Sequence, residues 1–286
     1  MTDFTKRKIH VKIRVFEKSN EEQDIELEGL RISATIDCPS QVLQGSCQLS
    51  IWGMSQQQMD SLTVMGPIMQ NRYRNQILVS AGDEDGDMPM TFLYSGYIDD
   101  AFANMNAAPN VNFFINSTSA AYDQVSQDKS HSYKGDRDVA AILQEMAKDF
   151  EWGFENHGPV SVVLRDRSYT GTRLTQVLDA IRDANINGNI DKGILRIWPR
   201  AGSVKGEHEI STKTGMIGYP TFSSAGVVVT TRFNPDIQRG QTAKVESTTR
   251  TASGSWIIDS VVHHIESEIP NGAWFTQVMT SGIPLE

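Results

Sequence analysis

The last quarter of the chain alternates β-forming runs with turn residues, and this order constrains the fold more than any other feature of the sequence. Five β-branched residues at 227–231 precede a Phe-Asn-Pro turn at 233–235. Further β-forming runs cover 242–248 and 254–264, and the last one begins near Trp274. β-branched and aromatic residues bounded by Gly, Asn and Pro are typical of strands and their turns. We therefore expect this part of the chain to be β throughout.

The beginning of the chain carries the same kind of signal. Ile9, Val11, Ile13 and Val15 alternate with polar or basic residues, a period that predicts a strand with one buried face. The polar residues at 17–24 predict a turn. Similar patterns predict further strands at 30–36, 47–51, 75–81, 90–98 and 111–116.

A short helix is predicted inside this first part. Ser55 is of a residue type that often caps helices, and Met59, Leu62 and Met65 follow at helical spacing, which predicts a helix over 56–64. Five or six short strands with one helix are typical of a small closed barrel that carries a helical insertion.

The middle of the chain has two helical patterns. Apolar residues from Val139 to Phe150 fall on one helix face, with Asp136 as the predicted N-cap, and Thr172 is predicted to cap a second helix. Two short strands are expected around the turn at 156–159, and a hairpin is expected to join 186–190 to 194–198. The alternation of helices with strand pairs predicts a compact α+β unit.

The predicted fold class is therefore mainly β, and α+β overall. Two β domains, residues 1–125 and 211–286, flank a smaller α+β domain at 126–210. A chain of 286 residues suits two or three domains.

Charge bears on the class of partner. The net charge of −9 gives a surface that repels nucleic-acid phosphates, so specific DNA binding is not expected. Most of the excess acid lies in residues 1–125, which hold 9 basic and 16 acidic residues. No apolar run approaches the roughly 20 residues that span a bilayer, and the N-terminus has no secretory pattern. We expect synthesis and retention in a cytoplasm.

Cys38 and Cys47 flank a predicted turn. A cross-strand disulfide is geometrically allowed, but a reducing compartment favours two free, buried thiols.

Short motifs follow one another in an order that resembles a known family. They are Gly29-Leu30-Arg31-Ile32, Ile51-Trp52-Gly53-Met54 with its helix, Ile77-Leu78-Val79-Ser80-Ala81-Gly82, and Tyr94-Ser95-Gly96-Tyr97-Ile98. Together with the order of strands and turns over 226–281, they resemble the baseplate hub proteins of contractile-tailed bacteriophages.

The resemblance implies a fold and an assembly. It implies two tube-like β-barrel domains separated by an α+β domain, and a homotrimer whose six barrels match a sixfold tail tube above and a threefold spike below. The implied partners are the tail tube protein and the spike protein, with tape-measure and baseplate wedge proteins as further candidates and DNA as a passing, non-specific cargo. The implied location is the tail baseplate of a virion assembled in the host cytoplasm.

No catalytic, cofactor-binding or metal-binding residue is predicted. His263 and His264 are adjacent in a predicted strand and so point to opposite faces, which disfavours a shared metal. The acidic loop at 83–87 lacks the glycine position and the twelfth-position acid of a calcium loop. The carboxylate pairs Asp99-Asp100 and Glu151-Glu155 are interpreted as solvated acids.

Six residues are predicted to have structural or interface roles. Phe233, Asn234 and Pro235 form a strand-ending turn, because proline removes a backbone donor and fixes the bend. Trp52, Trp256 and Trp274 lie in predicted strands, where core packing is expected and an interface role for one of them stays open.

Other functional classes stay open at this point. They are a tail-associated cell-wall hydrolase, a receptor- or carbohydrate-binding β module, and the related hub part of a contractile injection system. The hydrolase is disfavoured because the sequence contains no assembled catalytic motif. The β module is disfavoured because most tryptophans lie in predicted strands and not on loops.

Overall fold

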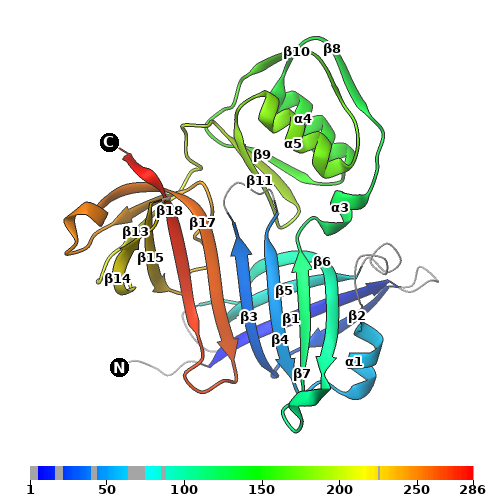
Figure 1. Cartoon of the computed structure of the whole chain (residues 1–286), viewed down its shortest axis with the longest axis vertical. Helices are drawn as coiled ribbons and strands as arrows, with labels where there is room; N and C mark the ends of the chain where they lie inside the picture. The colour runs from blue at the N-terminus through cyan, green and yellow to red at the C-terminus, as the bar shows by residue number, and fades with distance from the viewer. Residues whose placement is uncertain are drawn as a thin grey trace.

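The computed structural model describes residues 6–16, 22–39, 44–63, 75–84, 88–224 and 226–285. Strands predominate in this part of the chain, so the prediction of a mainly β protein with a few helices is confirmed. In Figure 1 the long strands stand side by side below a smaller part that holds most of the helices.

In its described residues the first β part has seven strands, a helix and a 3-10 turn. They are β1 (Arg7–Phe16), β2 (Glu22–Leu27), β3 (Arg31–Cys38), β4 (Ser46–Trp52), α1 (Gln56–Leu62), β5 (Gln76–Asp83), β6 (Thr91–Asn104), η1 (Met105–Ala107) and β7 (Asn112–Thr118). Ser55 caps α1 as predicted. Its hydroxyl accepts a hydrogen bond from the Gln58 amide, and the Gln58 side chain accepts one from the Ser55 amide.

Within the described residues, the last β part contains six strands, two more than the four that its sequence pattern predicts, and another 3-10 turn. They are β13 (Glu207–Ile210), β14 (Met216–Phe222), β15 (Val227–Arg232), β16 (Thr242–Val245), η2 (Arg250–Ala252), β17 (Gly254–Ser267) and β18 (Trp274–Leu285).

Both β parts belong to one sheet of 13 strands. Its main path runs β14-β15-β18-β17-β3-β4-β7-β6-β5-β1-β2, and β13 and β16 extend it from β17. The two parts join where β17 pairs antiparallel with β3, from Val261 opposite Cys38 to Ser267 opposite Ile32. These partners lie more than 200 residues apart in the sequence, so no local pattern could show the pairing.

The sheet folds back on itself around the core of the first part. Figure 1 shows β1 and β5 crossing behind β3, β4 and β7. Between these layers lie fully buried side chains such as Ile13, Ile32, Leu49 and Phe113. Burial of such a side chain contributes about 1.5–3 kcal/mol each, so this layer packing is the main stabilising feature of the first part.

Strand β2 corrects the prediction of a polar turn over 17–24. Its residues pair with β1, and its acids face the bases of that strand. The Lys12 ammonium lies 2.7 Å from Asp24 and 3.3 Å from Glu26. A strand this polar gives no two-residue hydrophobic alternation, so only its pairing with β1 reveals it.

The middle part combines helices with two small sheets. Its elements are α3 (Ala121–Val125), β8 (His131–Asp138), α4 (Val139–Asp149), β9 (Gly153–Asn156), β10 (Val163–Tyr169), α5 (Arg173–Asp183), β11 (Asn187–Asp191) and β12 (Ile194–Trp198). Helices α4 and α5 bury their apolar faces in a separate core that includes Val139, Leu143, Met146, Val177 and Ile181.

Three details of the middle part differ from prediction. The N-cap of α4 is Asp138 and not Asp136, because the Asp138 carboxylate accepts the Ala140 amide at 2.8 Å. Strand β8 was not predicted, because its sequence is highly charged. Strands β9 and β10 do not pair with each other, because β9 pairs with β12 and β10 pairs with β8. The cap of α5 by Thr172 and the hairpin of β11 with β12 agree with prediction.

A charged clamp holds α3, the helix that follows the first β part, to α5. Helix α3 follows β7, and Arg173 of α5 reaches back to its region. The Arg173 guanidinium lies 2.8 Å from Asp128 and 3.4 Å from the buried Asp123 carboxylate. Burial raises the pKa of Asp123 to about 6, and Arg173 opposes that rise.

Both cysteines are free thiols, as favoured by the sequence argument. Cys47 is buried and Cys38 is half-buried at the end of β3. Burial raises the pKa of the Cys38 thiol to about 11, so neither position has the features of a reactive thiolate. In the described part of the chain no helix has the length and apolar character needed to cross a membrane.

Candidate functional site

One face of the long sheet carries polar side chains from β17 to β6, and at β18 the row reaches Phe275, whose ring centre lies 4.9 Å from that of His264. One row across the strands contains His264, Thr35, Gln48, Asn116 and Asp100, from β17, β3, β4, β7 and β6 in that order. Residues that pair directly across strands share a face, so these five side chains lie in line. None of them is buried, and Asn116 donates a hydrogen bond to Asp100 at 2.8 Å.

A second row lies two residues further along the strands. It contains Glu266, Ser33, Ser50, Phe114 and Phe102, and Ser33 donates a hydrogen bond to Glu266 at 2.9 Å. Carboxylates therefore recur on this face. The seven strands from β15 to β6 contain no lysine, and Arg31 and Arg232 are their only arginines. We call these rows the polar face.

Behind the polar face, an aromatic seam joins the two β parts. Phe233 is buried in the core cluster of the first part, although it belongs to the last. Its ring meets Trp274 edge-on at 5.1 Å between centroids and His263 edge-on at 5.5 Å. The Arg7 guanidinium lies 5.4 Å from the Trp274 ring centre, which brings the start of β1 to the same seam.

Asn234 and Pro235 complete the turn at this seam. The Asn234 amide donates to the Thr276 hydroxyl at 3.1 Å, and the Asn234 side chain accepts the Asp236 amide at 2.9 Å. This hydrogen bond from the amide two residues further along the chain to the Asn234 side chain stabilises the turn. The structure thus brings together four of the six singled-out residues, namely Phe233, Asn234, Pro235 and Trp274.

The other two lie elsewhere. Trp256 is buried in the core of the last part, where its indole N–H donates to the Ala252 carbonyl at 3.0 Å. Trp52 is half-buried at the end of β4, and the Arg31 guanidinium lies 4.5 Å from its ring centre. An interface role for these residues stays a prediction.

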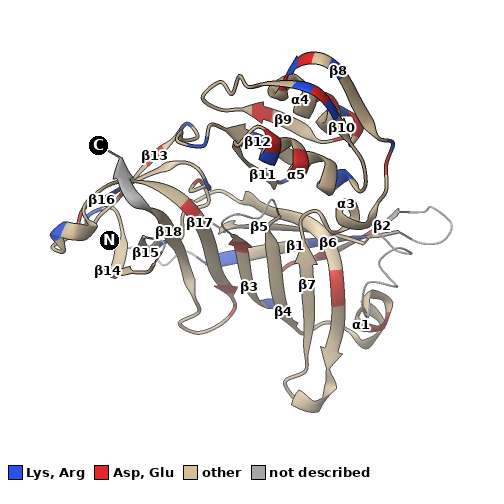
Figure 2. Ribbon diagram, turned by 45° about the horizontal axis from the view of Figure 1, so that its top comes forward, with Lys and Arg blue, Asp and Glu red and all other residues tan. Residues whose placement is uncertain are grey.

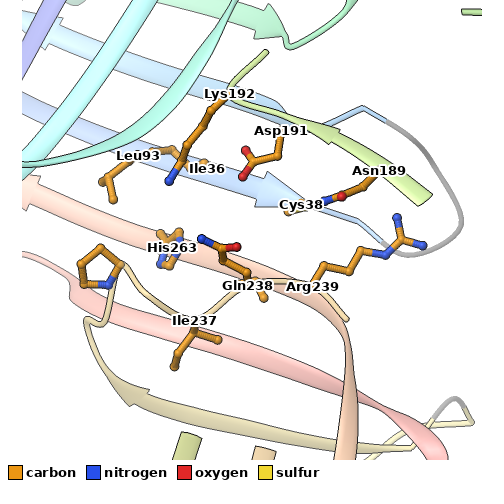
Figure 3. Close-up of a pocket in the computed structure, with 12 residues that line it drawn as sticks. Ile36, Cys38, Leu93, Asn189, Asp191, Lys192, Ile237, Gln238, Arg239 and His263 are labelled. Atoms are coloured by element: carbon orange, nitrogen blue, oxygen red, sulfur yellow. Dashed lines mark hydrogen bonds between the residues drawn. The ribbon is translucent and has the colours of Figure 1, made fainter. Parts of the chain in front are cut away.

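A small cavity of about 40 Å³ marks the point where all three parts meet. Figure 3 shows Cys38 and Leu93 of the first part, Asn189 and Lys192 of the middle part, and Arg239 and His263 of the last part around it. The tip of the β11–β12 hairpin enters this junction, with the Lys192 ammonium 5.9 Å from the Phe92 ring centre. A cavity of this size holds little more than water, so the junction is a packing site and not a substrate pocket.

His263 is a neutral structural residue at this junction. Its Nδ1 lies 2.9 Å from the Thr276 hydroxyl, and burial lowers its pKa to about 3, with Lys192 and His264 adding to the effect. His264 lies on the polar face instead, 3.4 Å from Thr35. The two histidines therefore occupy opposite faces, as predicted, and no cluster of three metal-ligating side chains occurs within the described ranges.

The middle and last parts meet through close backbone packing. Gly240 has φ +87°, and a β-carbon at this position would lie 2.7 Å from Val204 and 3.1 Å from the Trp198 ring. The buried Arg239 side chain lies 5.8 Å from the Trp198 ring centre. Sequence reasoning missed Lys192, Trp198 and Arg239, because their partners come from other parts of the chain.

The carboxylate pairs form no acid-base site. Asp99 and Asp100 accept hydrogen bonds from Thr118 and Asn116. Hydrogen bonds from His157 and then Arg196 lower the pKa of Glu155, whereas a general acid would need a raised one.

Comparison with known proteins decides the family. The sequence model of the family described as "Baseplate hub gp41" matches residues 9–276, which is nearly the whole chain. This chain belongs to the baseplate hub gp41 family. No curated protein matches the sequence.

Solved structures show the same fold in other tail proteins. A tail protein from Neisseria meningitidis MC58 aligns with a TM-score of 0.60 at 8% identity, over 95% of this chain and 96% of that one. The 43 kDa tail protein of prophage MuSo2 from Shewanella oneidensis aligns with a TM-score of 0.59 at 10% identity, over 95% and 98%. An E. coli component of the type VI secretion system, the c3393 protein, aligns with a TM-score of 0.57 at 7% identity, over 90% and 74%. At these identities the likeness is one of fold.

The family match, with the fold seen in other tail proteins, assigns this chain a structural role in the baseplate of a phage tail.

Proposed function

We propose that three copies of this chain form the central hub of the baseplate, a pseudo-sixfold ring that connects the tail tube to the threefold spike and lines the channel for DNA. The observation that carries this proposal is the polar face, which crosses from β17 of the last β part to β6 of the first. A tube wall needs one packed face and one wet face over its whole width, and this sheet has both.

The chemistry of the polar face suits the wall of a DNA channel. Half of the ten residues in its rows are Ser, Thr, Asn or Gln, Asp100 and Glu266 are acidic, and none is Lys or Arg; the others are His264, Phe114 and Phe102. Basic walls would hold the phosphates of passing DNA, whereas neutral and acidic side chains do not. The proposed channel residues are those of the two rows, centred on Thr35, Gln48 and Asn116.

Two β parts in one chain account for the change of symmetry. In this proposal residues 1–125 and 211–286 form two tube-like barrels, so that three copies present six barrels to the tail tube and a threefold arrangement to the spike. Residues 126–210 lie outside the wall, where tape-measure or wedge proteins can reach them. Assembly takes place in the host cytoplasm, and the chain has no enzymatic activity.

Native mass spectrometry tests the proposal directly. The purified chain is measured alone and after mixing with the spike protein from the same genome. A trimer, or a monomer that becomes a trimer with the spike, is the expected result. A monomer indifferent to the spike at tens of micromolar contradicts the hub, and zymography on peptidoglycan then distinguishes a tail-borne hydrolase from a binding module.

A further inference from the structure

A groove of about 720 Å³ lies between the two β parts. Its lining from the first part includes Asp83, Pro89 and Thr91, and its lining from the last part comes from β13 and from residues 231–237. Ligand sites in proteins usually have volumes of about 300–1,000 Å³. The groove therefore has room for a ligand, and the structural role described above does not use it.

The segments that line the groove are held in place by backbone hydrogen bonds. The Asp83 amide donates to the Met88 carbonyl at 2.8 Å, and β13 pairs with β16 along its whole length. At the other side of the groove, the Asn234 side chain accepts the Asp236 amide at 2.9 Å. Segments fixed in this way lose little conformational freedom when a ligand binds, so the groove is preformed.

Part of the lining is apolar. Ile210, Phe233 and Ile237 contribute to it, and each of them is at most 4% exposed. More accessible apolar lining comes from Met88, Pro89 and Pro235. A ligand with apolar side chains can therefore bury them in this groove.

The charged part of the lining is strongly acidic. It contains four carboxylates, those of Asp83, Glu207, Glu209 and Asp236, and one guanidinium, that of Arg232. In the part of the chain that the structure describes, none of the four carboxylates forms an ion pair, although many other acids do. Carboxylates without cationic partners around one groove attract a ligand that carries several positive charges.

A metal ion does not account for these acids. Within the described ranges, no three His, Cys, Asp or Glu side chains lie close enough together to hold one. A single divalent ion needs several oxygen ligands at about 2.0–2.6 Å. The four carboxylates therefore fit a ligand whose positive charges are spread along its length.

The spacing of two of the acids indicates the form of this ligand. Glu207 and Glu209 are alternate, exposed residues of β13, so their side chains leave the strand on the same side, roughly 6.5 Å apart along it. Alternate residues of an extended peptide repeat at the same distance. An extended segment with Lys or Arg at every second position therefore places one cation beside each glutamate.

We infer that the groove binds an extended segment of a partner protein that has Lys or Arg at alternate positions and apolar residues between them. The basic side chains pair with Glu207 and Glu209, and the apolar side chains contact Met88, Pro89 and Pro235. The inference goes beyond the proposed hub function, because it concerns a site on each copy and does not depend on the number of copies in a ring.

Peptide binding tests the inference. The probe is a fluorescein-labelled peptide of three Lys-Val repeats, and fluorescence anisotropy measures its binding to the full chain. A peptide of the same composition, with its lysines in one block and its valines in another, is the control for charge alone. We expect the alternating peptide to bind at least about fivefold more tightly, and its binding to weaken as salt increases.

Charge reversal in the groove distinguishes this site from general attraction to an acidic protein. Glu207→Lys combined with Glu209→Lys is expected to weaken binding of the alternating peptide at least about tenfold. Asp60→Lys is the matched control and should leave binding unchanged, because Asp60 is an exposed acid of α1, at the opposite side of the molecule from β13 (Figure 2). Asp236→Lys replaces the double variant if circular dichroism shows that loss of the Ser211–Glu209 hydrogen bond disturbs folding.

The outcomes separate this site from the hub function. Equal binding of the two peptides, equal weakening by Asp60→Lys, or no binding up to about 1 mM peptide overturns the inference. Loss of the native oligomer in the groove variants would assign the groove to a second copy of the chain, which also overturns it. The hub itself is tested by the native mass of the unmodified chain, which none of these peptide results changes.

Discussion

The Phe233 ring packs edge-on against Trp274, with 5.1 Å between ring centres, where the last β part meets the core of the first. The Phe233 amide also donates to the Trp274 carbonyl at 3.3 Å. Phe233 is thus a residue of the last part that is buried in the first, so the two β parts are expected to unfold together.

Phe233→Ala should destabilise the chain strongly. Removal of a buried phenylalanine leaves a cavity and costs about 3–5 kcal/mol in the free energy of unfolding. Urea unfolding followed by tryptophan fluorescence and by circular dichroism measures the loss. Phe222→Ala is the matched control, because Phe222 is 58% exposed and should change stability by less than about 0.5 kcal/mol. Equal effects of the two substitutions would contradict the buried seam.

Gly240→Ala should destabilise more than Gly193→Ala. Both glycines have positive φ, +87° and +76°, so an alanine costs about 1–2 kcal/mol of backbone strain at either position. Only at Gly240 does the new β-carbon also meet Val204 and the Trp198 ring, whereas nothing lies within 4 Å at Gly193. The difference in Tm between the two variants measures the cost of the close contacts that the new β-carbon makes at Gly240. A lower Tm for Gly193→Ala than for Gly240→Ala would contradict the close packing of Gly240 against Val204 and Trp198.

His263→Gln should remove part of the pH dependence of stability. In the folded chain burial lowers the pKa of His263 to about 3, and in the unfolded chain it lies near 6.5. Between these values the unfolded state binds the additional proton, so stability is full above pH 6.5 and falls as pH decreases, by up to about 1.4 kcal/mol per pH unit. Urea titrations at pH 7 and pH 5 should show a smaller difference in the variant. An unchanged difference would mean that His263 does not stay neutral.

Arg173→Met should weaken the clamp between α5 and α3. It leaves the Asp123 carboxylate buried without its partner, which costs about 3 kcal/mol at pH 7. A protonated, neutral Asp123 carboxyl group costs less to bury than the carboxylate. The loss in the free energy of unfolding should therefore be smaller at pH 5 than at pH 7. Urea unfolding at both pH values measures this. Adding Asp123→Asn should recover much of the stability, and a double variant as unstable as Arg173→Met would contradict the clamp.

Gln48→Lys should impair DNA delivery without impairing folding. Gln48 is exposed in the middle of the polar face, where a lysine would bind phosphates in the proposed channel. Infectivity of particles that carry the variant hub is expected to fall at least tenfold, with normal assembly by electron microscopy. Gln124→Lys, an exposed change of the same type on α3, is the control. Equal infectivity of both variants would place the channel elsewhere.

Much of the fold could be predicted from local pattern. Alternation at Ile9, Val11 and Ile13 predicts β1, and the polar cap residues Ser55 and Thr172 predict the starts of two helices. These signals are local because burial of one strand face or one helix face repeats with the period of the element. Charged strands such as β2 and β8 gave no such signal, because few of their residues are apolar and only Leu27 of β2 and Tyr133 of β8 join a hydrophobic core.

The candidate site could be predicted less well than the fold, because its residues come together from distant parts of the chain. The aromatic residues Phe233 and Trp274 could be singled out from the sequence, but not their burial against the first core. Lys192, Trp198 and Arg239 at the three-part junction carried no local signal.

The sequence by itself determined the β character of the chain and the order of motifs typical of baseplate hubs. Only the tertiary structure decided that β17 pairs with β3, which joins the two β segments into one sheet. Strand pairing over such a distance depends on backbone hydrogen bonds and shared cores, which are properties of the folded chain and not of any one segment.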